Sequence, residues 1–316
     1  MSVIGIFLAL ACGLGWATAD VLRKKLVIAG EPLKLAIELS ATQCAIAVGI
    51  FALMQPFEVE GWSEWSVSLG YWAYALPGFA CTAVGHLLFI KALRTSDLSL
   101  TIPFLSFSPI FVMLLGAFVL TESPSGLAAA GIVIVALGAY LLDGRAQRQG
   151  RSLSSAEVAA YRRGRTLMLI TAATWSAAAV LDKGALRHSS PIAHLVILLA
   201  ATSILLLVYR MLRPTLTRKH APQTASGAPS STSEPPRKAY RNRNLWFTSV
   251  VMMLALGTQL AAYAFWDVAY VEAVKRGLGL ICSVVFGALL FGEADPWKRL
   301  PAVVTMAVGA TLVILG

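Results

Sequence analysis

The chain has 316 residues, of which 57% are hydrophobic and only 13% are charged, and its mean hydropathy is +0.72. Soluble domains carry about 25% charged residues, so this composition excludes an ordinary soluble domain and predicts a protein that lies mostly in a lipid bilayer. The net charge of +10 would suggest nucleic acid binding in a soluble protein, but its distribution follows membrane topology here, and we expect no nucleic acid partner.

Ten apolar stretches follow one another along the chain, each close to the ~20 residues that a helix needs to cross ~30 Å of hydrocarbon. Because lipid offers the backbone no hydrogen-bond partners, each stretch is predicted to be a transmembrane helix. The first stretch lacks a basic n-region and a cleavage site, so we expect it to be retained. The stretches cover residues 3–22, 34–54, 70–93, 98–121, 126–142, 166–186, 190–212, 245–268, 271–292 and 298–315.

Lysine and arginine are concentrated in the loops after the first, third, fifth, seventh and ninth stretches, which hold most of the 26 such residues. The positive-inside rule places these loops in the cytoplasm of a cell with a plasma (inner) membrane. Both termini are then predicted to be outside. The segment 213–244 is rich in Pro, Ser, Thr and basic residues, and we expect it to be a disordered cytoplasmic loop.

Two motifs of the first half return in the second half. The odd number of stretches in each half means that the two copies insert with opposite orientation, an arrangement typical of transporters. The matching segments are Trp16–Lys24 with Trp175–Lys183, and Gly116–Glu122 with Gly287–Glu293.

We therefore predict an all-α integral membrane protein of ten transmembrane helices, built as two inverted five-helix repeats. The first repeat covers 1–143, a basic linker covers 144–165, and the second repeat covers 166–316 with the loop 213–244 inside it. The linker is expected to be partly helical around Ala156–Tyr161 and to carry no site.

Several segments of the first half resemble the EamA-type repeat of the drug/metabolite transporter superfamily. The resemblance implies a single-chain, ten-helix carrier of small organic solutes that works by alternating access and has no ATP site. Many ten-helix relatives have cytoplasmic termini, whereas the charges here indicate the reverse, and Leu280 stands where the first half has Pro109. The segments that carry the resemblance are Leu88–Leu93, Ser99–Thr101 with Pro103, Pro109 and Gly116–Glu122.

Helix-breaking residues in the fourth stretch point to a substrate site, because unwound backbone exposes amides and carbonyls. Pro103 and Pro109 enclose Ser106 and Ser108, and we predict that Ser106, Ser108 and Pro109 bind substrate. The equivalent part of the ninth stretch is Gly277–Gly279. The alternative is that proline and glycine are simply common in membrane helices.

Lys275 and Arg276 open the ninth stretch and resemble the Lys-Arg pair of the triose-phosphate translocator branch. In that branch the pair binds the anionic group of the substrate, which implies the same role here. Guanidinium matches a carboxylate or phosphate, and lysine adds a point charge. Alternatively, the two side chains reach the membrane interface, with Arg276 paired to Glu272 one turn earlier.

In the eighth stretch, Gln259, Tyr263 and Asp267 follow at intervals of four and are predicted to share one helix face. Such a face suits an organic solute or ordinary helix packing equally well.

Three residues are candidates for carrying a coupling proton: Asp20, Asp182 and His86. The two aspartates lie near the ends of the first and sixth stretches, and His86 lies within the third as the histidine expected to be deepest. A histidine titrates near neutral pH, but a hydrogen-bonded core histidine is the alternative.

Glu122 and Glu293 stand at helix C-terminal ends, where negative charge opposes the helix dipole, so we predict a structural role as caps of the fifth and tenth helices. Gly131 and Gly138 lie seven apart on one face and permit close helix contact. The fifth and tenth helices are therefore expected to support the bundle of a monomer or to form the face of a homodimer.

The leading functional hypothesis is a secondary active transporter of a small metabolite that is anionic or zwitterionic. An exporter of drugs or amphiphiles is the alternative within transport, and a non-transporting membrane protein or an intramembrane enzyme is the second alternative. An enzyme would require a convergent catalytic cluster, which the four histidines do not supply. No Gly-rich phosphate loop occurs, and the four cysteines lack metal-ligand spacing, so we expect no cofactor and no metal.

Overall fold

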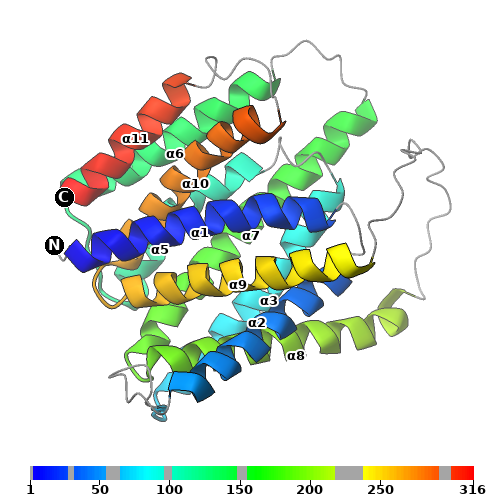
Figure 1. The fold of residues 1–316 in the computed structure, drawn as a ribbon. Coiled ribbons are helices and arrows are strands. Elements are labelled where there is room, and N and C mark those ends of the chain that lie inside the picture. The colour runs from blue at the N-terminus through cyan, green and yellow to red at the C-terminus, as the bar shows by residue number, and fades with distance from the viewer. Residues whose placement is uncertain are drawn as a thin grey trace.

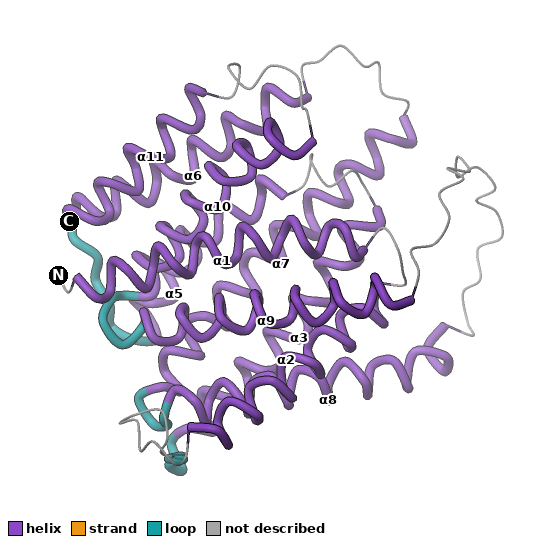
Figure 2. The backbone as a smooth tube through the Cα atoms, viewed as in Figure 1, coloured by secondary structure: helices purple, strands orange, loops and turns teal. Residues whose placement is uncertain are grey.

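The computed structural model describes residues 3–27, 32–54, 65–95, 102–147, 155–217, 238–291 and 300–316. These residues form ten α-helices and one 3-10 helix, and no strand occurs among them (Figures 1 and 2). The elements are α1 (Val3–Val27), α2 (Pro32–Met54), α3 (Tyr71–Thr95), η2 (Ile102–Phe107), α5 (Ser108–Val119), α6 (Gly126–Gln147), α7 (Ser155–Leu186), α8 (Pro191–Thr217), α9 (Lys238–Ala262), α10 (Val268–Phe291) and α11 (Leu300–Leu315). The all-α prediction is thus confirmed for the part of the chain that the structure describes.

Six helices in the described ranges are long and apolar enough to cross a membrane. They are α1, α2, α3, α7, α8 and α9, and three shorter apolar helices are found in α5, α6 and α11. Large apolar side chains such as Phe7, Leu53 and Phe118 are exposed on the outside of the bundle. Exposed apolar side chains of this size are expected where lipid rather than water surrounds the protein.

The helices pack as one bundle in which segments from the two halves of the chain alternate (Figure 1). α1 lies along α9, α3 lies along α7, α2 packs on α8, and α6 packs on α11. The N-terminus and the C-terminus lie at the same end of the bundle, whereas α8 ends and α9 begins at the opposite end (Figure 1).

The pair of α6 and α11 has glycines at its contact. A Cβ atom added to Gly131 would lie 2.6 Å from the Gly309 carbonyl oxygen, and one added to Gly138 would lie 2.6 Å from Met306 Cγ. Only residues without a side chain permit backbones to approach this closely. The glycine face of α6 is therefore occupied by α11 of the same chain.

Four of the expected boundaries differ most from the structure. Helix α7 begins at Ser155, so residues 155–165 of the expected linker are helical. Helices α8 and α9 likewise extend through 213–217 and 238–244, which were expected to be disordered, and the rest of that loop lies outside the described residues. The eighth stretch ends as a helix at Ala262 rather than near 268. Basic and polar residues do not prevent a helix from extending beyond the hydrocarbon, where water and lipid headgroups solvate them.

The fourth span is broken where the prolines predicted a break. Residues Ile102–Phe107 form a 3-10 helix, and α5 starts at Ser108 with Pro109 in its first turn. Proline suits this position because the first turn of a helix has no acceptor for its missing N–H. The matching segment of the second half has no such break, since α10 continues past Gly277 and Gly279.

Candidate functional site: a buried charged cluster

Two charged side chains of α10 form an ion pair in the interior. Glu272 and Lys275 are three residues apart, lie on one face of the helix, and are 2% and 9% exposed. A charged group in the middle of a membrane costs about 2.5–3.5 kcal/mol on insertion scales, so such groups face partners or functional sites. The pairing of opposite charges compensates part of this cost. We call these residues and the polar side chains bonded to them the central cluster.

Gln259 of α9 connects the members of the central cluster. Its Oε1 accepts hydrogen bonds from Trp16 Nε1 at 2.7 Å and from Lys275 Nζ at 3.3 Å. Its Nε2 donates to the Tyr263 hydroxyl at 2.6 Å and to Glu272 Oε1 at 3.4 Å. Tyr263 in turn donates to Glu272 Oε1 at 3.2 Å. One amide thereby satisfies both charged groups, as buried polar groups require.

The broken fourth span and α7 complete the cluster. Ser108, the first residue of α5, lies 3.5 Å from Glu272 Oε2 and 3.0 Å from the Ser176 hydroxyl. Ser176 also donates to the Ser108 carbonyl at 3.0 Å. Helices α1, α5, α7, α9 and α10, or the turns that follow them, therefore contribute polar groups to one place.

Arg276 differs from Lys275 in having no hydrogen-bond or ion-pair partner among the described residues. Its Nε atom is buried without a partner, and its side chain is only partly exposed. Lys275, not Arg276, pairs with Glu272. The central cluster therefore contains one carboxylate, one cation paired with it, and one adjacent cation that lies within electrostatic range of the same carboxylate but forms no ion pair among the described residues.

A second group of charges lies at the end of the bundle that holds both termini. Lys183 Nζ is 2.5 Å from Glu122 Oε1 and 3.8 Å from Asp267 Oδ1, and it donates to the Trp266 carbonyl at 2.8 Å. Glu122 Oε2 accepts a hydrogen bond from the Val268 amide at 3.1 Å. Glu122 thus bonds to the N-terminus of α10, and not to that of α6 as the sequence had suggested.

Asp267 is therefore separated from the two residues with which it was expected to share a helix face. Helix α9 ends at Ala262, so that Asp267 lies in the turn before α10, whereas Gln259 and Tyr263 are in the central cluster. Its backbone carbonyl accepts hydrogen bonds from the amides of Tyr270 and Val271. Residues spaced by four share a face only within one continuous helix, and α9 ends before it reaches Asp267.

The remaining predicted site residues are spread over the molecule. Asp20 is exposed and forms an ion pair with Arg23. His86 packs edge-on against Trp175, and its Nδ1 is buried without a partner in the described residues. Pro109 is buried at the start of α5. The side chain of Ser106 and the whole of Glu293 lie outside the described residues.

Among the histidines that the structure describes, the most deeply buried is His194 of α8, not His86. His194 is fully buried, and its Nε2 is 3.3 Å from Oδ1 of Asp182, a residue that was a candidate from its sequence position. Its Nδ1 is 3.0 Å from the Tyr71 hydroxyl. The sequence places this histidine near the start of an apolar stretch, which gives no sign of its depth.

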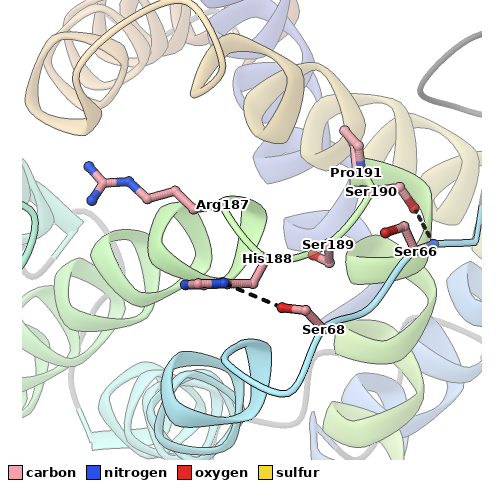
Figure 3. A pocket seen from close by; sticks show the side chains of 7 residues that line it. All are labelled: Ser66, Ser68, Arg187, His188, Ser189, Ser190 and Pro191. Atoms are coloured by element: carbon pink, nitrogen blue, oxygen red, sulfur yellow. Dashed lines mark hydrogen bonds between the residues drawn. The ribbon is translucent and has the colours of Figure 1, made fainter.

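A surface pocket of about 390 Å³ lies at the same end of the bundle as the termini, around the loop between α7 and α8 (Figure 3). His188 Nδ1 is 3.4 Å from the Ser68 hydroxyl, and the Ser66 amide donates to Ser190 Oγ at 3.4 Å. Arg187 extends away from the serines, and its head group bonds to the Leu120 carbonyl instead (Figure 3). The pocket is thus lined mainly by hydroxyls and presents no clustered charge.

Several members of the central cluster were not predicted from the sequence. Glu272 had been considered only as a partner of Arg276, and Cys12, Trp16 and Ser176 had not been considered as site residues. The sequence does contain one indication of the Glu272–Lys275 pair. An acidic and a basic residue three positions apart inside an apolar stretch both need a polar partner, and each can serve as the partner of the other. Among the described residues, no group of three or more metal-ligating side chains occurs.

Comparisons with known proteins inform both the first half and the fold. Residues 3–142 match the EamA-like transporter family. A crystal structure whose title names no function aligns with 98% of this chain and 96% of its own chain at a TM-score of 0.72 and 15% identity, which shows a shared fold alone. A search of curated proteins found no match. Residues 3–142 of this multi-pass membrane protein are thus similar to the EamA-like transporter family.

Proposed function

We propose that this protein is a secondary active transporter that carries a small anionic or zwitterionic metabolite by alternating access. The observation that carries the proposal is the buried Glu272–Lys275 pair beside Arg276, which has no partner among the described residues. A transporter needs a polar site inside the membrane that is built from several helices, and the central cluster meets that requirement.

The charges of the central cluster favour a substrate with an anionic group. Lys275 is already neutralised by Glu272, so that Arg276 leaves an excess positive charge next to the cluster. The planar guanidinium group suits a carboxylate or a phosphate. The ammonium group of a zwitterionic substrate could bind to Glu272 and the face of the Trp16 ring. Lys275 Nζ occupies such a position in this structure, at 5.9 Å from the centroid of the Trp16 ring. A purely cationic drug would be repelled by Arg276 and has only one carboxylate to bind.

The packing of the helices supports the proposal of two inverted repeats. α1 and α7 hold the first place in the two halves, and each lies along the helix in the third place of the other half, α9 and α3. The second helices of the halves, α2 and α8, pack on each other, and so do the fifth helices, α6 and α11. A pseudo-two-fold axis in the membrane plane would produce this pattern.

The burial of the central cluster indicates an occluded conformation within the proposed cycle. Glu272, Gln259 and Tyr263 are at most 6% exposed, so a solute reaches them only after helices separate. Alternating access provides this separation on one side at a time. Ser108 lies at the break between η2 and α5, where the backbone can change direction at low cost.

Ligand-dependent stability of the purified protein tests the substrate class. We would measure thermal unfolding with succinate, glycerol 3-phosphate, L-serine, glycine betaine, glucose, choline and tetraphenylphosphonium. A ligand at a hundred times its Kd stabilises by about 2.7 kcal/mol, so an anion or zwitterion should raise the midpoint, and Arg276→Ala should reduce the shift at the same ligand concentration by about half or more. Arg187→Ala is the matched control, because Arg187 bonds far from the cluster, to Leu120. Stabilisation by choline or tetraphenylphosphonium alone would instead favour the drug exporter.

A further inference from the structure

A second buried polar group lies where α3, α7 and α8 meet. His194 of α8 has its Nε2 at 3.3 Å from Asp182 Oδ1 and its Nδ1 at 3.0 Å from the Tyr71 hydroxyl. His194 and Tyr71 are fully buried, and Asp182 is 6% exposed. The imidazole thus joins a carboxyl of α7 to a phenol of α3. Three groups that can each bind or release a proton thus lie next to one another, with a hydrogen bond between His194 and Tyr71 and ion-pair distance between His194 and Asp182.

The charge of Asp182 is not compensated by any lysine or arginine of the described residues. Its neighbour Lys183 turns to Glu122, and no other basic group than His194 is within ion-pair distance of Asp182 in the part of the chain that is described. Asp182 Oδ1 and His194 Nε2 have no hydrogen-bond partner among the described residues, each other included, so their contact is one of ion-pair distance alone. The pair is therefore electrically neutral only when it holds a proton, either as imidazolium beside carboxylate or as imidazole beside carboxylic acid.

We propose that Asp182 and His194 are the proton-binding site that couples transport to a proton gradient, an inference that rests on the transport function proposed above. In the occluded conformation the pair holds one proton, because an uncompensated carboxylate is unfavourable in an apolar interior. When the helices open to one side, water solvates the carboxylate and the proton leaves to that water. A proton must bind again before the site closes.

The surroundings of the pair contain few other titratable groups. Tyr71 and Cys81 of α3, and Tyr263 after α9, lie within electrostatic range of Asp182. Among the described residues, α2 and α9 bring no charged group within ion-pair distance of either member. Phe79 stacks on the His194 ring at 6.5 Å between centroids. The protonation of the pair is thus controlled mainly by the access of water.

Two connections join this pair to the central cluster. Tyr263 lies within electrostatic range of Asp182 and donates a hydrogen bond to Glu272. Helix α7 carries both Ser176, which bonds to Ser108, and Asp182, six residues further along or about 9 Å at 1.5 Å per residue. A displacement of α7 that opens one site therefore also disturbs the other.

The protonation state of the pair can be measured without any substrate. The chain has four histidines, so nitrogen-15 histidine and carboxyl-carbon-13 aspartate labelling give a small number of NMR signals in lipid nanodiscs. His194→Gln and Asp182→Asn assign the signals of the pair, and His188→Gln is the control. At pH 7 we expect one bound proton, seen as imidazolium beside carboxylate or imidazole beside carboxylic acid. A neutral imidazole beside an ionised carboxylate would overturn the proposal.

Transport in proteoliposomes then tests the coupling. The probe is the compound among succinate, glycerol 3-phosphate, L-serine and glycine betaine that stabilises the protein most. Asp182→Asn should lower uptake driven by a pH gradient at least tenfold, to the level without a gradient, while exchange at equal pH stays within about threefold of wild type. His188→Gln should keep both activities. Gradient-driven uptake by Asp182→Asn at the wild-type rate refutes the coupling role, whereas a wild-type protein that neither accumulates nor exchanges any probe refutes the transport function instead.

Discussion

Glu122 Oε1 and Lys183 Nζ are 2.5 Å apart and join the two halves of the chain at the end of the bundle where both termini lie. Lys183 also donates a hydrogen bond to the Trp266 carbonyl, and Glu122 accepts one from the Val268 amide. Three segments that are far apart in the sequence, around Glu122, Lys183 and Trp266–Val268, are thereby joined by one ion pair. Breaking this contact is a necessary step if the bundle opens at this end.

The Glu122–Lys183 pair is predicted to contribute measurably to stability. Breaking a buried pair costs about 3–5 kcal/mol, and we expect the lower end of that range for Glu122→Gln or Lys183→Met, because both side chains keep some exposure. The double variant should lose less than the sum, which equilibrium unfolding in mixed micelles can measure. Asp20→Asn breaks an exposed pair and should cost below about 1 kcal/mol. Additive losses would show that the pair is not coupled.

Gln259→Leu is predicted to be strongly destabilising. The change leaves Trp16 Nε1 without its acceptor and removes one acceptor of Lys275. Each unsatisfied buried group costs about 1–3 kcal/mol, so the free energy of unfolding should fall by more than about 2 kcal/mol. Thr258→Val is the control at the adjacent position, since its hydroxyl bonds only within its own helix, and it should change stability little. Equal effects of the two variants would contradict the role of Gln259 as the connecting residue.

Arg276 is predicted to bind the anionic group of the substrate. A hydrogen bond to a charged group is worth about 1.5–3 kcal/mol, so Arg276→Ala should weaken binding by roughly ten- to a hundredfold. Arg276→Lys should recover only part of the loss, because the planar fork is absent. Ligand affinity and uptake are measured in variants with a wild-type unfolding midpoint. Wild-type transport by both variants would show that Arg276 is not a substrate ligand.

The contact between α6 and α11 is predicted to tolerate no side chain at Gly131. An added Cβ would lie 2.6 Å from the Gly309 carbonyl oxygen and 2.8 Å from the Val313 amide nitrogen, both of them backbone atoms that cannot turn aside. Overpacking of this kind costs about 1–3 kcal/mol. Gly257→Ala is the matched control, because an added Cβ there meets nothing within 4 Å and should stabilise α9 by about 0.5–1 kcal/mol. The measurement is the unfolding midpoint of the two variants.

Both termini are predicted to face the outside of the cell, and the loop 213–244 is predicted to face the cytoplasm. The structure places the termini at one end and the ends of α8 and α9 that flank this loop at the other (Figure 1). The excess of lysine and arginine in the loops at the end opposite to the termini then predicts that this end faces the cytoplasm. A fusion after Gly316 should be active with a periplasmic reporter such as alkaline phosphatase. Activity of a cytoplasmic reporter at the same site would show that the family orientation prevails over the charges.

The helical architecture followed from simple features of the sequence. Apolar runs of about 20 residues predicted the helices, and Pro103 and Pro109 predicted the break in the fourth span, because both features act locally. The ends of the helices were less predictable. Only a short helical part around Ala156–Tyr161 was expected in the linker, yet all of 155–165 is helical, and 238–244, which was expected to be disordered, begins α9.

The composition of the central cluster was predicted only in part. Gln259, Tyr263, Lys275 and Ser108 were candidates and are brought together, but Trp16 and Ser176 come from distant helices whose facing sides depend on tertiary packing. The partner of Glu272 was also misjudged. Positions three and four residues away lie on nearly the same face, so only the rotation of α10 in the bundle decides between Lys275 and Arg276.

The histidines show the same limit of sequence reasoning. His86 lies in the middle of an apolar stretch and was expected to be the deepest, whereas His194 lies four residues into α8 and is fully buried. Position along a helix gives depth across the membrane, but burial depends on which side of the helix meets another helix. That information is contained in contacts between α3, α7 and α8 that the sequence does not reveal.

Helix α7 bears residues of all three polar groups: Ser176 in the central cluster, Asp182 in the pair with His194, and Lys183 in the ion pair with Glu122. It is a single uninterrupted helix of 32 residues, about 48 Å long at 1.5 Å per residue, and it behaves as a stiff rod. A rod cannot shift at one contact while remaining fixed at the next. In the proton-coupled transport proposed above, a substitution that lets α7 bend, such as Ala178→Pro, should therefore separate proton movement from solute movement and produce a leak rather than slower coupled transport.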